Sequence, residues 1–156
     1  MNNHTLITRT GFSLIEMVTV VLIIGILSAV AVPKVYDSMD AYRLKLAAET
    51  IAGDLKYARQ QAISRSQSIT VSFDLINESY TISDIQDRNH PDQTYAVSLT
   101  DTPSPADIVS VSSTPAAVIT FNQYGIPVSE AIVTLDVSGS QKTVIVHASS
   151  GRVSIP

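Results

Sequence analysis

One carboxylate stands alone in a long apolar run near the start of the chain. From Phe12 to Val32 there are 21 residues, and Glu16 is the only charged one. A helix rises about 1.5 Å per residue, so this run is long enough to cross the roughly 30 Å hydrocarbon core of a bilayer. An ionised group within such a helix is costly to bury and usually marks function. Glu16 is therefore the first candidate functional residue.

The residues around Glu16 form a wider pattern. A short polar leader ends at Gly11, Phe12 follows it, Glu16 is the fifth residue counted from Phe12, and Pro33 closes the apolar run. This pattern closely resembles the class III signal of type IV pilins and of type II secretion pseudopilins. The resemblance implies that prepilin peptidase cuts between Gly11 and Phe12 and methylates the new amino group of Phe12. It also implies that Glu16 faces the Phe12 amine of a neighbouring subunit in the assembled filament.

The same resemblance divides the chain into four parts. Residues 1–11 are a leader peptide, and residues 12–33 are the transmembrane helix of a single-pass inner-membrane protein. Residues 34–66 form an amphipathic helix, and residues 67–156 form an antiparallel β domain in the periplasm. Pro33 is expected to kink one continuous helix as it leaves the lipid, because a proline removes one helical hydrogen bond.

Beyond Pro33, hydrophobic periodicity predicts a helix. Apolar residues recur at alternating spacings of four and three, which indicates one helix face packed on a sheet. This apolar stripe consists of Leu44, Ala48, Ile51, Leu55, Ala58 and Ala62. Gly53 lies within the same helix at a cost of about 1 kcal/mol relative to alanine, and a close contact with the sheet would explain it.

From Ser68 onward the hydrophobic period changes to two, which predicts strands. The expected strands cover residues 69–73, 80–82, 95–99, 108–111, 118–121, 131–137 and 143–148. Residues 84–94 predict a polar loop, and residues 138–141 predict the connection of the last hairpin. Nearby prolines confine strand 108–111 to a sheet edge or to its ends. The predicted fold class is α+β and pilin-like, with a long N-terminal helix packed on one antiparallel sheet or on two small sheets.

Two later stretches resemble the GspH/FimT branch of the pilin family. They are residues 54–63, which lead into an alternating strand, and the series Phe121, Gly125 and Gly151-Arg152. The implied function is that of a minor pilin or pseudopilin, a structural subunit of a type II secretion pseudopilus or a type IV pilus, and not an enzyme. The implied partners are other pilin or pseudopilin subunits, prepilin peptidase and the inner-membrane assembly platform.

Two alternatives to this interpretation stay open. One is a DNA-uptake minor pilin, suggested by comparison of Gly151-Arg152-Val153 with the basic tails of DNA-binding minor pilins. Its weakness is that Arg152 has no second basic residue after it. The other is a secreted or anchored β-domain with an ordinary signal peptide, for which residues 29–31 offer a cleavage site. This second alternative gives Gly11, Phe12 and Glu16 no role.

Composition argues against several other functions. The chain has no cysteine, which excludes disulfides and thiol chemistry and departs from major pilins with a disulfide-closed loop. Removal of the leader leaves nine Lys and Arg against fourteen Asp and Glu, a formal net charge of −5. Such a surface makes nucleic acid an unlikely main partner in this interpretation.

Few residues suggest catalysis or metal binding. His4, His90 and His147 lack metal-ligand spacing, and no serine lies in a nucleophile motif, so we expect no catalytic residue, metal or cofactor. An oxygen-rich loop leaves calcium as an open question, although its spacing is not that of an EF-hand. Its members are Asp84, Asp87, Asn89 and Asp92.

Overall fold

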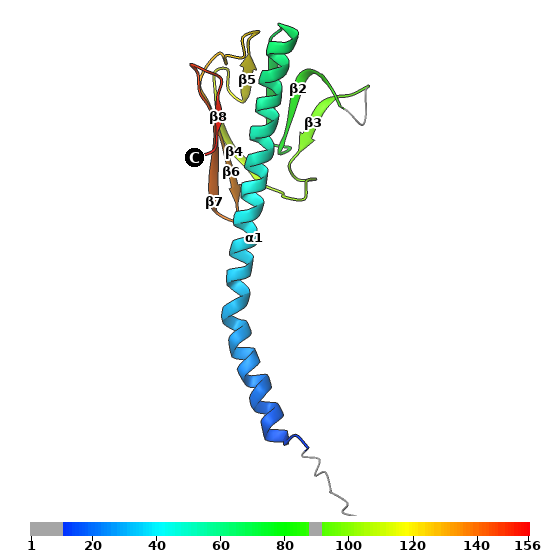
Figure 1. The fold of residues 1–156 in the computed structure, drawn as a ribbon, viewed down its shortest axis with the longest axis vertical. Helices are drawn as coiled ribbons and strands as arrows, with labels where there is room; N and C mark the ends of the chain where they lie inside the picture. Colours follow the sequence, from blue (N-terminus) through cyan, green and yellow to red (C-terminus); the bar gives the residue numbers. More distant parts are fainter. Residues whose placement is uncertain (1–10, 88–91) are drawn as a thin grey trace, which may run out of the picture. The chain divides into compact units, whose positions relative to one another are not determined.

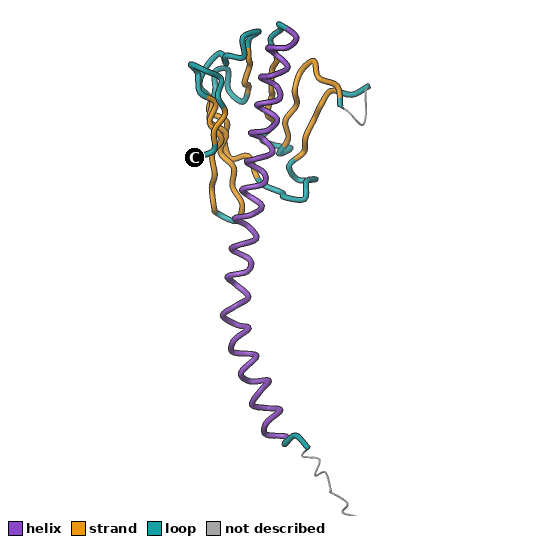
Figure 2. The backbone as a smooth tube through the Cα atoms, viewed as in Figure 1, coloured by secondary structure: helices purple, strands orange, loops and turns teal. Residues whose placement is uncertain are grey.

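One helix followed by eight strands makes up the described chain (Figures 1 and 2). The computed structural model describes residues 11–87 and 92–156, without the side chains of residues 30–33 and 37. The helix is α1 (Leu14–Arg65). The strands are β1 (Ile69–Asp74), β2 (Ser79–Gln86), β3 (Thr94–Ser98), β4 (Asp107–Ser112), β5 (Val118–Phe121), β6 (Ala131–Val137), β7 (Ser140–Val146) and β8 (Val153–Ser154).

The chain divides into two units, Met1–Ser38 and Met39–Pro156, and all the buried apolar residues of the described chain belong to the second. The predicted stripe from Leu44 to Ala62 is confirmed, because each of its six members is at most 5% exposed. The explanation offered for Gly53 is wrong. Gly53 is exposed, and a Cβ built there would meet nothing within 4 Å.

The strands form two antiparallel four-stranded sheets, which decides between the two architectures expected from the sequence. Sheet A has the order β3-β2-β1-β5, and sheet B has the order β4-β6-β7-β8. The fold is therefore α+β and pilin-like, with the second half of α1 packed against both sheets. Figure 1 shows β2 and β3 on one side of α1, and β4, β6, β7 and β8 on the other.

Sheet A is completed by the pairing of two strands that are far apart in the sequence. The predicted hairpin is confirmed, since β1 and β2 pair from Val71 with Ile82 to Asp74 with Ser79. On its other edge β1 pairs with β5, which places Val71 beside Ile119. Thr70 and Thr120 join the same two strands through their hydroxyl groups, whose oxygens are 3.1 Å apart. The edge position predicted for strand 108–111 is also confirmed, because β4 is the outer strand of sheet B.

Two predicted boundaries are wrong for reasons of backbone geometry. The loop expected over residues 84–94 is shorter, since β2 continues to Gln86 and Ile85 is buried. A register irregularity between Ile82 and Gln86, with Asp84 at a φ of 57°, lets the strand continue past polar residues. The β6–β7 connection is also shorter than expected. Ser138 and Gly139 both have positive φ, which suits a two-residue hairpin turn.

Candidate functional site

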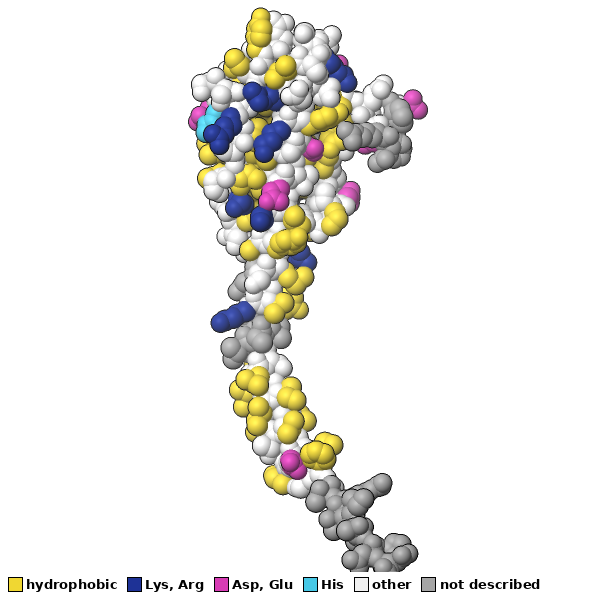
Figure 3. Space-filling view, in the orientation of Figure 1, with side chains coloured by type: hydrophobic (Ala, Val, Ile, Leu, Met, Phe, Trp, Pro, Cys, Tyr) yellow, Lys and Arg dark blue, Asp and Glu magenta, His cyan; other side chains and the backbone are white. Residues whose placement is uncertain are grey.

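The large apolar side chains at the start of α1 all face outward. Between Phe12 and Leu27 they are 49–82% exposed, and Figure 3 shows them along the helix. A helix that is apolar all round belongs inside a protein or a membrane. Within the described residues no single helix has the length and composition of a membrane span, whereas the bent pair Leu14–Ala29 and Lys34–Arg65 has them together. This segment therefore presents an apolar surface that needs a lipid or protein environment.

Glu16 lies in the first turn of this apolar helix. The backbone oxygen of Ser13 accepts hydrogen bonds from the N–H groups of Glu16 (3.1 Å) and Met17 (3.2 Å). Ser13 was not among the residues predicted from the sequence. Serine three residues before glutamate is the capping-box spacing, so the sequence did contain this signal. The helix dipole also favours a carboxylate at this end.

The Glu16 carboxylate is available for a partner. No hydrogen bond or ion pair engages it within residues 11–87 and 92–156. Glu16 instead lines a shallow hollow of about 180 Å³ whose other members are apolar: Phe12, Met17, Val20 and Val21. A carboxylate at the rim of an apolar surface can pair with a cation that arrives from another subunit.

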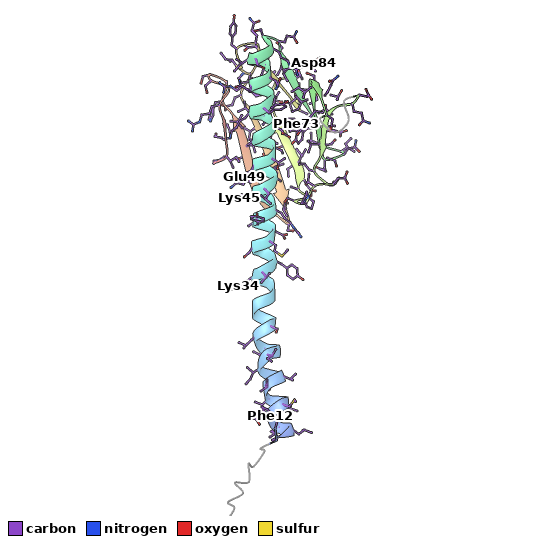
Figure 4. All side chains as sticks on the ribbon, turned by 45° about the vertical axis from the view of Figure 1, so that its right-hand side comes forward. Phe12, Lys34, Lys45, Glu49, Phe73 and Asp84 are labelled. Atoms are coloured by element: carbon purple, nitrogen blue, oxygen red, sulfur yellow. The ribbon has the colours of Figure 1, made fainter. Side chains whose placement is uncertain are left out.

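Gly11 and Phe12 precede α1 in backbone without regular structure. Both residues are exposed, and a Cβ built on Gly11 would meet nothing within 4 Å. Figure 4 labels Phe12 at this end of the helix. Cleavage between the two residues stays a prediction. The side chain of Pro33 lies outside the described residues, so the predicted kink stays a prediction as well.

In the second unit, a carboxylate ties α1 to sheet A. Asp54 accepts hydrogen bonds from the hydroxyl of Tyr80 (2.5 Å) and from that of Tyr95 (3.1 Å to each oxygen). Burial, and after it the charge of Asp54, raises the pKa of Tyr95 to about 12 and raises that of Tyr80 further. Both phenols therefore remain protonated donors at neutral pH.

An arginine and two glycines tie α1 to the turn that follows β5 and to the turn that precedes β8. The Arg59 Nε donates to the backbone oxygen of Gly125 at 3.0 Å. Gly151 has a φ of 63°, and a Cβ built on it would lie 2.0 Å from that same oxygen and 2.9 Å from the Arg59 Nε. Only glycine fits this close approach of three segments. Gly125 and Gly151, which belong to the C-terminal series that resembles GspH/FimT proteins, therefore help to pack these turns against α1.

The candidate catalytic and metal residues are not assembled into a site in the described chain. His147 follows β7, and its Nε2 lies 2.9 Å from the Ser154 Oγ. The strand expected to reach Ala148 ends at Val146, because the chain turns back where the Gly151 N–H donates to the His147 oxygen. The described residues contain no group of three or more His, Cys, Asp or Glu that could hold a metal. His4, Asn89 and His90 lie outside them.

Comparisons with known proteins identify the fold and the family. The chain is similar to the type IV minor pilin FimU of Pseudomonas aeruginosa, with 17% identity and a TM-score of 0.57 over 74% of this chain and 90% of that one. It is similar to the minor pseudopilin EpsH of the type 2 secretion system of Vibrio cholerae, with 16% identity and a TM-score of 0.56 over 73% and 96%. No curated protein matches significantly.

These structural similarities show the shared fold, and a family model shows the relationship. The model for the type II transport protein GspH matches residues 47–151, which include the buried stripe of α1 from Ala48 to Ala62, the strands β1 to β7 and Gly151. Members of this family are structural subunits that assemble with other pseudopilins. The chain therefore belongs to the GspH family of type II transport proteins, the minor pseudopilins of type II secretion, and is not an enzyme.

Proposed function

We propose that this chain is made as a precursor, is cut by prepilin peptidase between Gly11 and Phe12, and carries an N-methylated Phe12 when mature. Residues 12–33 then hold it in the inner membrane by a single pass. The amphipathic helix 34–66 and the β domain 67–156 lie in the periplasm. From the membrane the subunit enters the pseudopilus through the inner-membrane assembly platform.

The observation that carries this proposal is the exposed apolar segment with its single charge. The large apolar side chains from Phe12 to Leu27 are at least 49% exposed, and Glu16 has no partner within the described residues. In a filament, water is excluded from packed helices, so an unpaired carboxylate is penalised. Pairing with the Phe12 amine of a neighbour offsets that penalty at one axial stagger only. The charge therefore sets register more than it adds net stability.

The second candidate function is that of a subunit of a type IV pilus. The fold resembles FimU and EpsH equally well, with TM-scores of 0.57 and 0.56, so fold does not separate a pilus from a pseudopilus. The family model, which is named for type II transport, favours secretion.

N-terminal mass analysis of the membrane-extracted protein tests the proposal. The expected N-terminus is an N-methylated Phe12 in the parent chain. Gly11→Val should accumulate as the uncut precursor, because a branched side chain at the cut site obstructs the protease. A mature N-terminus at Val32 would instead identify an ordinary signal peptide, and rapid maturation of Gly11→Val would contradict the class III signal.

A further inference from the structure

A second apolar stripe runs along α1 within the unit Met39–Pro156. Met39, Tyr42 and Leu46 follow one another at spacings of three and four residues, which places them on one face of the helix. Met39 is 46% and Tyr42 is 61% exposed, so this face is not the one that the sheets cover. We call these three residues the outer stripe. Figure 3 shows hydrophobic side chains on the surface of the middle part of α1.

Ion pairs border the outer stripe on both sides. A helix turns about 100° per residue, so Arg43 and Lys45 fall on opposite sides of the line from Tyr42 to Leu46. Arg43 pairs with Asp40 at 3.1 Å, and Lys45 pairs with Glu49 at 3.8 Å, the latter two labelled in Figure 4. A narrow apolar seam between charged side chains is the pattern of a helix that packs against another helix. A lipid surface fits it less well, because acyl chains would meet the charged groups.

The outer stripe leads into a hollow between α1 and the segment that joins β3 to β4. This hollow has a volume of about 340 Å³ and mostly apolar walls, and we call it the α1 groove. Leu46 belongs both to the outer stripe and to the groove, so the two form one continuous surface. The walls include Leu46, Ala47 and Thr50 of α1, and Leu99, Pro103 and Ser104 of the connecting segment.

The hydroxyl group of Ser104 has no partner within residues 11–87 and 92–156, although the residue is only 8% exposed. Every fully enclosed polar side-chain atom of those residues does have a partner. The Ser104 oxygen therefore keeps an opening, and the α1 groove is a hollow that Ser104 lines. A buried hydroxyl without a partner lowers stability, and its hydrogen-bonding capacity is free for a group that enters the groove.

Gly53 is a second position at which the isolated subunit loses stability. It lies seven residues after Leu46, on the same face of α1. It is exposed, and a Cβ built there would meet nothing within 4 Å, so no contact in the described chain explains a residue that weakens a helix. A glycine lets a second helix approach closely. Positions that lower the stability of the subunit without a gain inside it are expected at functional surfaces.

We propose that the outer stripe and the α1 groove bind an apolar helix face of a different pseudopilin. The spacing of the outer stripe and its bordering ion pairs specify a helix as the occupant. The second helix passes close to Gly53, and one of its polar groups meets the Ser104 hydroxyl in the groove. The family assembles with other pseudopilins, so the occupant is another member and not a copy of this chain. The inference rests on the proposed function, since it names the surface through which the subunit joins a neighbour.

Photo-crosslinking of the full-length chain tests this contact in membranes that contain the complete set of pseudopilins. Tyr42 is replaced by p-benzoylphenylalanine, and Tyr124, which is 69% exposed between β5 and β6, is replaced in the same way as the matched control. The Tyr42 position should give a product that the Tyr124 position does not give. Mass spectrometry should assign the crosslinked peptide to the helix of another chain that carries the class III signal.

Three results of this crosslinking would overturn the contact. They are a product with lipid, a product with a second copy of this chain or with a protein that lacks the class III signal, and equal products from the two tyrosine positions.

Two substitutions separate binding from folding. Gly53→Gln should not lower the melting temperature of the detergent-solubilised chain, because glutamine is a better helix former than glycine. Ser104→Ala should not lower it either, because the hydroxyl has no partner in the subunit. In the Tyr42 crosslinking chain, Gly53→Gln should reduce the product about tenfold and Ser104→Ala about fivefold, as for the loss of close packing and of one hydrogen bond.

Lys56→Gln is the control for both substitutions, because Lys56 is exposed on α1 outside the outer stripe. It should leave both the product and the melting temperature at their parental values. Parental crosslinking in Gly53→Gln and Ser104→Ala, or a lower melting temperature in either of them, would overturn the proposal.

The same membranes report on the proposed function separately, since their N-termini are measured alongside the crosslinks. A methylated Phe12 without the Tyr42 product overturns the helix contact alone. An uncut precursor overturns the proposed processing, whatever the crosslinks show.

Discussion

At the scale of single residues, Glu16 is the group whose role is most open to test. It is exposed in the first turn of an apolar helix, and the helix dipole already favours its charge there. Its removal should therefore leave insertion and leader cleavage nearly unchanged. What should fall is incorporation into filaments, because a neighbour's Phe12 amine loses its carboxylate.

We expect Glu16→Ala and Glu16→Gln to mature at the parental rate and to incorporate at least about tenfold less, as for the loss of one buried charge pair. Crosslinking to partner pseudopilins, with cleavage followed in the same samples, measures both steps. Thr19→Ala is the matched control, since the Thr19 hydroxyl donates only to the Ile15 oxygen of its own helix (2.8 Å). Parental incorporation of Glu16→Gln would remove the main physical support for the proposed assembly role.

Replacement of glycine by alanine should have opposite effects on stability at two positions of this chain. Gly151→Ala should destabilise the fold by about 2–4 kcal/mol, because the φ of 63° is strained for alanine and the Cβ would meet the Gly125 oxygen at 2.0 Å. Gly53→Ala should stabilise it by up to about 1 kcal/mol, because that helix position is open. Thermal unfolding of the detergent-solubilised chain measures both. A harmless Gly151→Ala would contradict the close packing of α1 against the two turns.

At the scale of elements, the tie between α1 and sheet A gives a pH dependence. Burial and the Asp54 charge raise the pKa of Tyr95 from 10.0 to about 12, and they raise that of Tyr80 as well. Between pH 10 and 12 the folded chain keeps phenol protons that the unfolded chain releases. The stability that these protons contribute is complete below pH 10 and is lost as the pH rises through 12.

The melting temperature should therefore fall between pH 10 and pH 12, and it should fall less steeply in Tyr95→Phe. The slope is the readout, because Tyr95→Phe also removes a hydrogen bond and lowers stability at every pH. Tyr124→Phe, at a residue that is 69% exposed, is the control and should keep the parental slope. An unchanged slope in Tyr95→Phe would show that this phenol does not titrate with folding.

At the scale of the whole molecule, the core is confined to one unit. The buried apolar residues run from Leu44 to Val153, and all lie within Met39–Pro156. A fragment of residues 34–156 should therefore fold and stay soluble without detergent. Circular dichroism should show helix and strand with a cooperative melt. An unfolded fragment, or one that folds only in detergent, would mean that the apolar N-terminal segment contributes to the fold.

Local patterns in the sequence were enough to predict most of the helix and strand positions. The stripe from Leu44 to Ala62 and the alternation in β1 record which face of a helix or strand is buried, and that information repeats within a few residues. The family signal at Gly11, Phe12 and Glu16 is also local, since it depends on order and spacing alone. The boundaries that failed depend on positive φ at Asp84 and Ser138, which periodicity does not encode.

Contacts between distant segments were decided by the tertiary structure. The pairing of β1 with β5, the convergence of Tyr80 and Tyr95 on Asp54, and the meeting of Arg59 with Gly125 all join residues that share no local pattern. Each depends on how the helix lies across two sheets, because only that packing brings the side chains within hydrogen-bond reach. Hydrophobic period determines which faces are buried, whereas the packing of those faces determines which residues meet.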